Sequence, residues 1–231
     1  MAGETAKTEA VCLRIAPWSR TSHVVSWLTP SGKVTTVVKG AVRPKSAFLG
    51  QYDLNYTCEI VHYLGGSGDM HPLRECTPLD GREFLRSDFR ELLLAEHFRE
   101  IVSELAPSGP DASDWYELLV EALDGLAGLS AAGRLQALLA FELAALRLAG
   151  LSPESASPDG SFMMCGERRI PISTEVAHCL RAPHLIKCPK TLQDAVRAVG
   201  IFWTYHLEDV PPTRRATVQA VSTTEQRGNE R

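Results

Sequence analysis

The sequence contains no run of about 18 consecutive apolar residues, the length that a membrane-spanning helix requires. Its first residues, MAGETAKTEA, also lack the charged and then apolar pattern of a secretory signal. Both absences argue against export and against a membrane partner. We therefore expect the protein in the cytoplasm.

Close pairs of cysteines are missing as well. Cysteines stand at positions 12, 58, 76, 165, 179 and 188. Because the cytoplasm keeps thiols reduced, this spacing argues against a disulfide framework. Structural zinc sites usually pair ligands two to four residues apart, and Cys165 has no such neighbour, although His178, Cys179, His184 and Cys188 follow it. We expect no bound metal and no cofactor.

Signatures of catalysis are absent too. No combination of a nucleophile with a base stands out in the chain, and no carboxylate pair stands out from ordinary helix faces. The glycine-rich stretch Gly65-Gly66-Ser67-Gly68 is not followed by the Lys-Ser/Thr and helix of a phosphate-binding loop, so a hairpin turn is the better interpretation. We expect a protein that is not an enzyme.

What the chain does have is the composition of a globular protein. It has 231 residues, of which 44% are hydrophobic and 23% charged. This balance excludes disordered and fibrous chains, and the length suffices for one large domain or two small ones.

Charge is distributed unevenly along the chain. Residues 1–52 carry seven basic and two acidic residues, a balance of +5, whereas the whole chain has a net charge of -4. The remainder therefore carries -9. A polyanion would be attracted to the N-terminal part and repelled by much of the rest.

The N-terminal part has the pattern of a small all-β unit, with short β-branched runs divided by turn residues. Pro30 and Gly32 lie where a tight hairpin needs a fixed φ and then a positive φ, and 65–69 provides a second reversal. Five strands are expected: Ala10–Ile15, Thr21–Leu28, Gly32–Lys39, Tyr52–His62 and Met70–Thr77. A meander of this length closes most economically as a barrel of the oligonucleotide-binding (OB) type.

Beyond Asp80 the apolar period changes to about 3.6, which indicates amphipathic helices. The expected helices are Arg82–Leu105, Asp114–Leu126 behind a Ser113 cap, Gly133–Ala149 ending at Gly150, and a last one opened by a Thr191/Asp194 capping box and running to about Glu208. Prolines and glycines make 151–190 loop-rich. The predicted fold is α+β, with a barrel domain at 1–80, a helical domain at 81–221 and a polar tail at 222–231.

Basic and aromatic residues are interleaved in the predicted barrel. The cations are Arg20, Lys33, Lys39, Arg43 and Lys45, and the aromatic residues are Trp18, Trp27, Phe48 and Tyr52. Single-stranded nucleic acid is bound by such a combination, in which cations neutralise phosphates and bases stack on aromatic faces. The alternative is that the cations form a solvated face and the aromatic rings fill the barrel core.

Several stretches resemble the RecO family of bacterial DNA repair and recombination mediators. Residues 13–28 (LRIAPWSRTSHVVSWL), 29–34 (TPSGKV) and 37–46 (VVKGAVRPKS) are similar to the N-terminal barrel of that family. REFLRSDFRELLLAEHFREIVSEL resembles its first helix after the barrel, and FELAALRLAGLSPE resembles the core helix before a segment that often holds zinc.

The resemblance implies binding of single- and double-stranded DNA, partnership with RecR and with single-strand DNA-binding protein, and help in loading RecA during gap repair. It also implies annealing of complementary strands, without covalent chemistry. DNA contact is carried over to Lys33, Lys39, Arg43 and Lys45, which lie in the matching motif, and to Arg20. Many members begin a four-cysteine zinc site with Cys-x-x-Cys-Gly, where this chain has FMMCG at 162–166, so a metal-free, zinc-site-like remnant is expected.

Two other functions remain open. The barrel of a non-enzymatic adaptor would dock protein partners, and such a protein would show no salt-dependent DNA affinity. A small hydrolase using Cys165 or Cys179 with a histidine is the weakest alternative, because nothing else in the sequence indicates such an activity.

Overall fold

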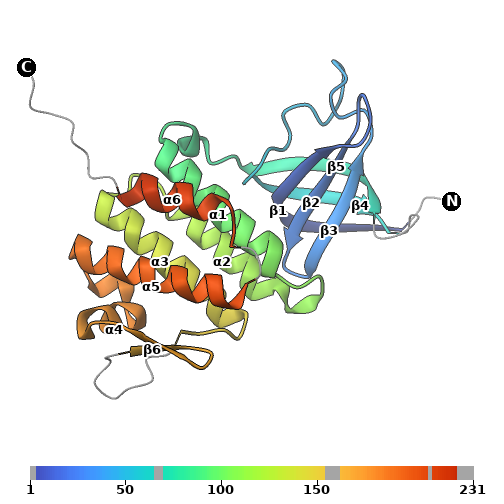
Figure 1. The fold of residues 1–231 in the computed structure, drawn as a ribbon. Coiled ribbons are helices and arrows are strands. Elements are labelled where there is room, and N and C mark those ends of the chain that lie inside the picture. Colours follow the sequence, from blue (N-terminus) through green and yellow to red (C-terminus); the bar gives the residue numbers. More distant parts are fainter. Residues whose placement is uncertain (1–3, 65–69, 154–161, 208–209, 223–231) are drawn as a thin grey trace, which may run out of the picture. The chain divides into compact units, whose positions relative to one another are not determined.

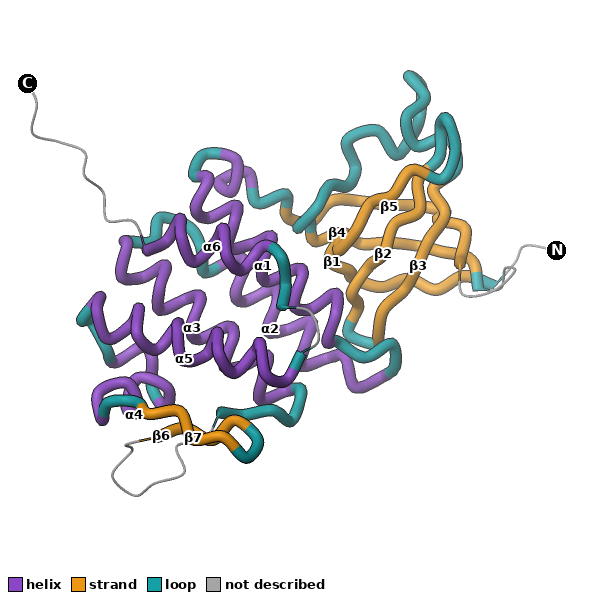
Figure 2. The backbone as a smooth tube through the Cα atoms, viewed as in Figure 1, coloured by secondary structure: helices purple, strands orange, loops and turns teal. Residues whose placement is uncertain are grey.

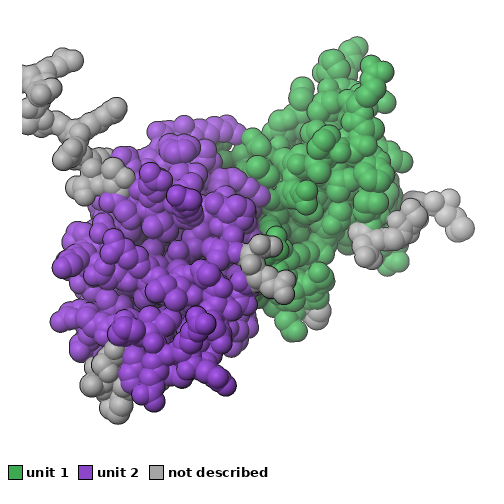
Figure 3. Space-filling model, in the orientation of Figure 1, with its two compact units in different colours: residues 1–83, 102–124 green, residues 84–101, 125–231 purple. Residues whose placement is uncertain are grey.

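The computed structural model describes residues 4–64, 70–153, 162–207 and 210–222. The chain forms two compact units, shown in Figure 3. The barrel unit consists of Met1–Glu83 and Val102–Asp124, and the helical unit consists of Phe84–Ile101 and Gly125–Arg231. The predicted tail after Ser222 and the reversal at 65–69 lie outside the described residues.

Five strands of the barrel unit form a closed barrel (Figures 1 and 2). They are β1 (Thr5–Pro17), β2 (His23–Thr29), β3 (Gly32–Val38), β4 (Thr57–Tyr63) and β5 (Met70–Asp80). Their order is β1-β2-β3-β5-β4, and every neighbouring pair is antiparallel except β3 and β5. Within the part of the chain that the structure describes, closure gives every strand of this barrel two neighbours. The predicted OB-type barrel is confirmed.

Strand β1 pairs with both β2 and β4 because it is long and has a bulge near its middle. Its first half pairs with β4 and its second half with β2, and the β2 register shifts between Cys12 and Arg14. Such a bulge bends a strand sharply, which a small barrel requires. Inside, the fully buried Trp27 side chain occupies the core with Cys12, Val25 and Ile60.

The predicted hairpin between β2 and β3 is confirmed. Thr29 pairs with Gly32, whose φ is +128°, and the Thr29 hydroxyl accepts a hydrogen bond from the Ser31 amide at 3.1 Å. The predicted fourth strand begins too early, because β4 starts only at Thr57. Asn55 has a φ of +65°, which extended backbone cannot accommodate, and its amide donates to the Cys12 carbonyl at 3.1 Å.

Helix α1 (Phe89–Leu105) runs through both units, and α2 (Ser113–Asp124) belongs to the barrel unit. The helical unit adds α3 (Ala131–Leu148), α4 (Thr174–Arg181), α5 (Pro189–His206) and α6 (Thr213–Ser222), with a hairpin of β6 (Phe162–Cys165) and β7 (Arg168–Pro171). Short 3-10 turns lie at Glu83–Arg86, Pro110–Ala112 and Pro183–Leu185. No helix in the described part of the chain is long and apolar enough to cross a membrane.

The predicted helix Arg82–Leu105 is interrupted. Arg82 has a φ of +44°, and its buried guanidinium donates to the carboxylate of Asp124 at 2.8 Å and to the carbonyl of Asn55 at 2.7 Å. Regular helix starts only after Asp88, whose carboxylate accepts from the Arg90 amide at 2.8 Å. The first turn of the predicted helix is therefore not α-helical. The Arg82 side chain instead connects the end of α2 to the barrel.

Three further predictions need correction in the C-terminal half. Helix α5 begins at Pro189, before the predicted Thr191/Asp194 capping box, because proline fits the first helical turn. The Asp194 carboxylate forms an ion pair with Arg197 instead of capping the helix. The segment predicted as loops also contains the β6–β7 hairpin and α4. Ser173 is the N-cap of α4, and its hydroxyl accepts a hydrogen bond from the Val176 amide at 3.2 Å. Helix α6 was not predicted at all.

Candidate nucleic-acid interface

Two connections of the barrel meet and form one surface, which we call the loop surface (residues 18–22 and 39–49). The Gly40 amide donates to the Ser22 hydroxyl at 3.2 Å, and the Val42 amide donates to the Thr21 carbonyl at 3.3 Å. Within the first connection, the Trp18 amide donates to the Ser22 carbonyl at 2.9 Å. These bonds hold the two connections side by side, although about 20 positions separate them in the sequence.

Four of the five predicted DNA-binding cations lie on the loop surface. The side chains of Arg20, Lys39, Arg43 and Lys45 are all exposed. Residues 10–52 contain no acidic residue, so no carboxylate of this stretch neutralises the four charges. The loop surface therefore concentrates positive charge within a chain that is acidic as a whole.

Gly40 shapes this surface. Its φ is +68°, a left-handed conformation that glycine adopts without strain, and the Arg43 amide donates to its carbonyl at 3.1 Å. A Cβ atom on Gly40 would lie 3.2 Å from Cδ of Arg43, so the arginine side chain lies across the glycine. Because Gly40 has no side chain, the Arg43 side chain has room to lie over the turn.

Lys33 has a different environment. Its side chain is half-buried, and its ammonium donates to the carbonyl of Ser103 in α1 at 2.7 Å. Burial lowers the pKa of Lys33, and the nearby carboxylate of Glu104 partly offsets that effect. The structure therefore separates Lys33 from the other four cations, and its contact with DNA stays a prediction.

The four aromatic residues also separate into different roles. Trp18 is 58% exposed on the loop surface, whereas Trp27 is buried and its indole donates to the Thr36 hydroxyl at 2.8 Å. Tyr52 bonds the ring of His23 at 2.8 Å, and its half-buried position raises the pKa of its hydroxyl. Phe48 packs partly against the core. Of the four rings, Trp18 is thus the most exposed to solvent.

Comparison with known proteins agrees with this architecture. Residues 86–157 match the family model described as "Recombination protein O C terminal". DNA repair protein RecO of Anaeromyxobacter dehalogenans (strain 2CP-1) is 33% identical over 152 residues, which cover 65% of this chain and 59% of that protein. DNA repair protein RecO of Acetivibrio thermocellus is 27% identical over 150 residues, or 64% of this chain and 58% of that protein. A large part of the chain is therefore similar to RecO proteins.

The matched stretch thus spans slightly less than three fifths of the length of these RecO proteins. The family model covers α1, the segment with α2, and α3, which supports the predicted order of a barrel followed by helices.

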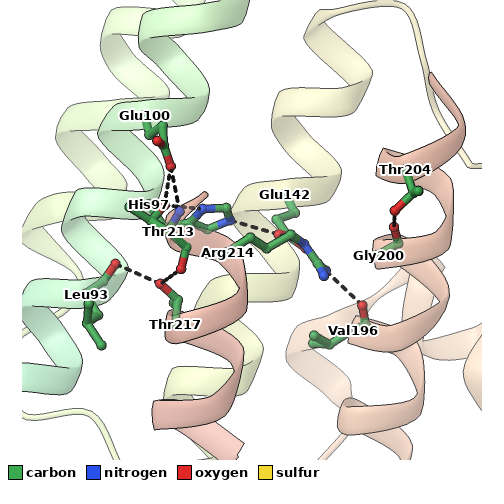
Figure 4. Close-up of polar contacts among 10 residues, drawn as sticks. All are labelled: Leu93, His97, Glu100, Glu142, Val196, Gly200, Thr204, Thr213, Arg214 and Thr217. Atoms are coloured by element: carbon green, nitrogen blue, oxygen red, sulfur yellow. Dashed lines mark hydrogen bonds and ion pairs between the residues drawn. The ribbon is translucent and has the colours of Figure 1, made fainter. Parts of the chain in front are cut away.

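A buried ionic network among the helices of the helical unit was not predicted from the sequence (Figure 4). The fully buried carboxylate of Glu142 in α3 accepts from His97 Nε2 at 2.9 Å and from two nitrogens of Arg214 at 2.7 and 2.9 Å. Burial alone would raise the pKa of Glu142, but the bonds from His97 and Arg214 outweigh it and lower the pKa. The one sequence signal is a carboxylate inside the otherwise apolar run FELAAL.

This network attaches α6 to three other helices. Arg214 also donates to the Val196 carbonyl of α5 at 2.9 Å, and the Thr213 hydroxyl bonds Glu100 of α1. Thr217 donates to the Leu93 carbonyl of α1 at 3.1 Å (Figure 4). Because the network joins α6 to α1, α3 and α5, we assign its members a role in holding these helices together.

The cysteines of the C-terminal half lie on three different elements. Cys165 in β6 and Cys179 in α4 are buried, and Cys188 is exposed at the start of α5. Burial raises the pKa of Cys165 and raises that of Cys179 to about 11. Within residues 4–64, 70–153, 162–207 and 210–222, no group of three or more His, Cys, Asp or Glu side chains is placed to hold a metal.

Proposed function

We propose that this protein is a member of the RecO family and a DNA-binding recombination mediator whose loop surface contacts the nucleic acid. One observation carries the proposal: Arg20, Lys39, Arg43 and Lys45 are exposed on two hydrogen-bonded connections, beside an exposed Trp18 and without an acidic residue from 10 to 52. Phosphate groups are the ligand that such a surface suits best.

The expected binding is largely electrostatic. Each cation that neutralises a phosphate releases a condensed counterion, so affinity falls as salt concentration rises. Four phosphate contacts correspond to a slope of about -2.8 in a plot of log affinity against log salt for a single strand. Stacking of one base on Trp18 adds about 1–3 kcal/mol and favours single strands, because bases in a duplex are already stacked.

The proposed roles in strand annealing and in RecA loading rest on the same positive charge of the loop surface. Neutralising the backbones of two strands lowers the repulsion between them, which would support annealing as well as the handing over of a single strand to RecA. RecR and single-strand DNA-binding protein are the proposed partners in that reaction. The proposed activity is binding and positioning, without a catalytic step.

Fluorescence anisotropy of a labelled single-stranded oligonucleotide tests this proposal at two or more salt concentrations. The test variant replaces Lys39, Arg43 and Lys45 with alanine. The control replaces Lys187, Lys190 and Arg215, three exposed cations of the helical unit, and changes net charge equally. We expect the first variant alone to lose affinity and about three quarters of the salt slope.

A second function is favoured by apolar side chains on the same surface. Val42 and Leu49 are 48% and 58% exposed among the cations, a combination that also suits an acidic protein partner with apolar anchors. If neither the wild type nor the control variant binds DNA at low salt, the mediator proposal fails. The adaptor function then takes its place.

A further inference from the structure

Two histidines lie against each other on neighbouring strands of the barrel. The ring centroids of His62 in β4 and His71 in β5 are 5.1 Å apart, and the ring planes are inclined by 40°. In the antiparallel ladder His62 is paired with Leu73. His71 is therefore the diagonal neighbour of His62, on the same face of the sheet.

The nitrogen atoms of the pair are suited to bind a ligand. His62 is only 4% exposed, and its Nδ1 lies 3.4 Å from the carbonyl oxygen of Tyr63. A carbonyl can only accept, so this long hydrogen bond places the proton on Nδ1 and the lone pair on Nε2. Nδ1 of His71 is buried and has no hydrogen-bond partner among the described residues. Such an unsatisfied nitrogen is costly and needs an explanation.

Burial favours the neutral form of His62. Burial lowers the pKa of His62, and the neighbouring His71 lowers it further against the effect of the Tyr63 carbonyl. Neutral imidazole is the form that coordinates metal ions. The spacing agrees as well, because two imidazoles bound at about 2.0–2.1 Å to one tetrahedral ion bring their ring centroids to about 5 Å from each other.

We propose that His62 and His71 form a two-histidine site for a divalent transition-metal ion such as Zn²⁺, with water in the remaining coordination positions. Because each histidine comes from a different strand, the bound ion bridges β4 and β5. Binding to the folded barrel alone stabilises it through mass action. This site is separate from the cysteines of the helical unit and does not depend on the proposed DNA contacts.

The probe is Zn²⁺ alone, titrated into ¹⁵N-labelled full-length protein and followed through the histidine side-chain nitrogens in long-range ¹H–¹⁵N spectra. The protein carries Cys188→Ser, which removes the exposed thiol as a competing ligand. We expect one equivalent of Zn²⁺ to shift the ring nitrogens of His62 and His71 together. The resonances of His184, exposed at another place, stay unchanged at that ratio.

Two variants and one control complete the test. His62→Gln and His71→Gln each remove one of the two protein ligands and should weaken Zn²⁺ binding about tenfold or more, whereas His184→Gln should not. His71 is less buried than His62, so His71→Gln keeps the test valid if the other variant fails to fold. Zinc that shifts one ring only, or that binds His71→Gln as tightly as the parent protein, overturns the proposal.

Discussion

The ammonium of Lys33 donates a hydrogen bond to the backbone carbonyl of Ser103, a residue 70 positions later in the chain. The bond satisfies a carbonyl in the last turn of α1, where the helix itself supplies no partner. It connects the β2–β3 hairpin to a helix of the same unit. A residue that the sequence groups with the DNA-binding cations thus has a structural partner.

Replacing Lys33 with methionine should therefore lower stability more than DNA affinity. Methionine keeps the apolar stem and removes the charged donor, which we expect to cost about 1 kcal/mol because the site is half-exposed. Urea unfolding measures the loss, and Lys39→Met is the matched control that should weaken DNA binding instead. Unchanged unfolding with a reduced salt slope for Lys33→Met would assign Lys33 to the DNA contact.

Trp18 should distinguish single from double strands. Trp18→Ala removes a stacking surface and is expected to weaken binding of a single-stranded oligonucleotide by about 1–3 kcal/mol, with a smaller effect on a blunt duplex of equal length. Trp18→Phe should recover part of the loss. Anisotropy titrations at one salt concentration compare the three proteins, and an equal loss for both DNA forms would contradict stacking.

Arg214 should be essential for the stability of the helical unit, unlike its neighbour Arg215. Arg214→Met leaves the carboxylate of Glu142 buried with His97 as its remaining ring partner and should cost about 3–5 kcal/mol. Arg215 is exposed, so Arg215→Met should stay within about 0.5 kcal/mol of the wild type. Equal denaturation midpoints for the two variants would show that the network contributes little.

The lowered pKa of Glu142 predicts a specific dependence of stability on pH. A carboxyl group whose pKa is lower in the folded than in the unfolded state stabilises the fold above its unfolded value, here about 4.5. That contribution disappears as pH falls through the folded pKa. The stability difference between the wild type and Glu142→Gln should therefore be constant above pH 4.5 and shrink below it. Urea unfolding at several pH values measures it, and a constant difference down to pH 3 would contradict the shift.

Gly32 should tolerate alanine less well than Gly50. Both have a positive φ, +128° and +75°, so both variants carry backbone strain. A Cβ atom on Gly32 would also lie 2.9 Å from the carbonyl oxygens of Ser108 and Gly109, whereas nothing lies within 4 Å at Gly50. We expect Gly50→Ala to cost about 1–2 kcal/mol and Gly32→Ala clearly more, as measured by thermal unfolding.

The sequence predicts best those elements that local patterns determine. The β2–β3 hairpin follows from Pro30 and Gly32, and α3 follows from its apolar run and the stop at Gly150, where φ is +73°. The late start of β4 could not be predicted in this way. It depends on a left-handed Asn55 bonded to Cys12, a contact across 43 positions.

Helix α6 shows a second limit. Its side chains are mostly polar, and within it only Thr217 and Val221 are buried, so no apolar stripe marks it in the sequence. The helix is positioned by Glu100, Glu142 and the carbonyl of Val196, all distant in the chain. For the candidate interface, residue type identified the cations, but only the three-dimensional contacts separated Lys33 from the other four.

The parallel pairing of β3 with β5 has a consequence for the order of folding. This seam consists of the pairs Thr35–Met70, Thr36–His71 and Val37–Pro72, each 35 positions apart, whereas the β2–β3 hairpin joins neighbours in sequence. Closing a long loop costs more chain entropy than forming a local turn, so the hairpin should form early and the seam late. Until then β3 is an open edge, and the nascent chain is most vulnerable to aggregation during that interval.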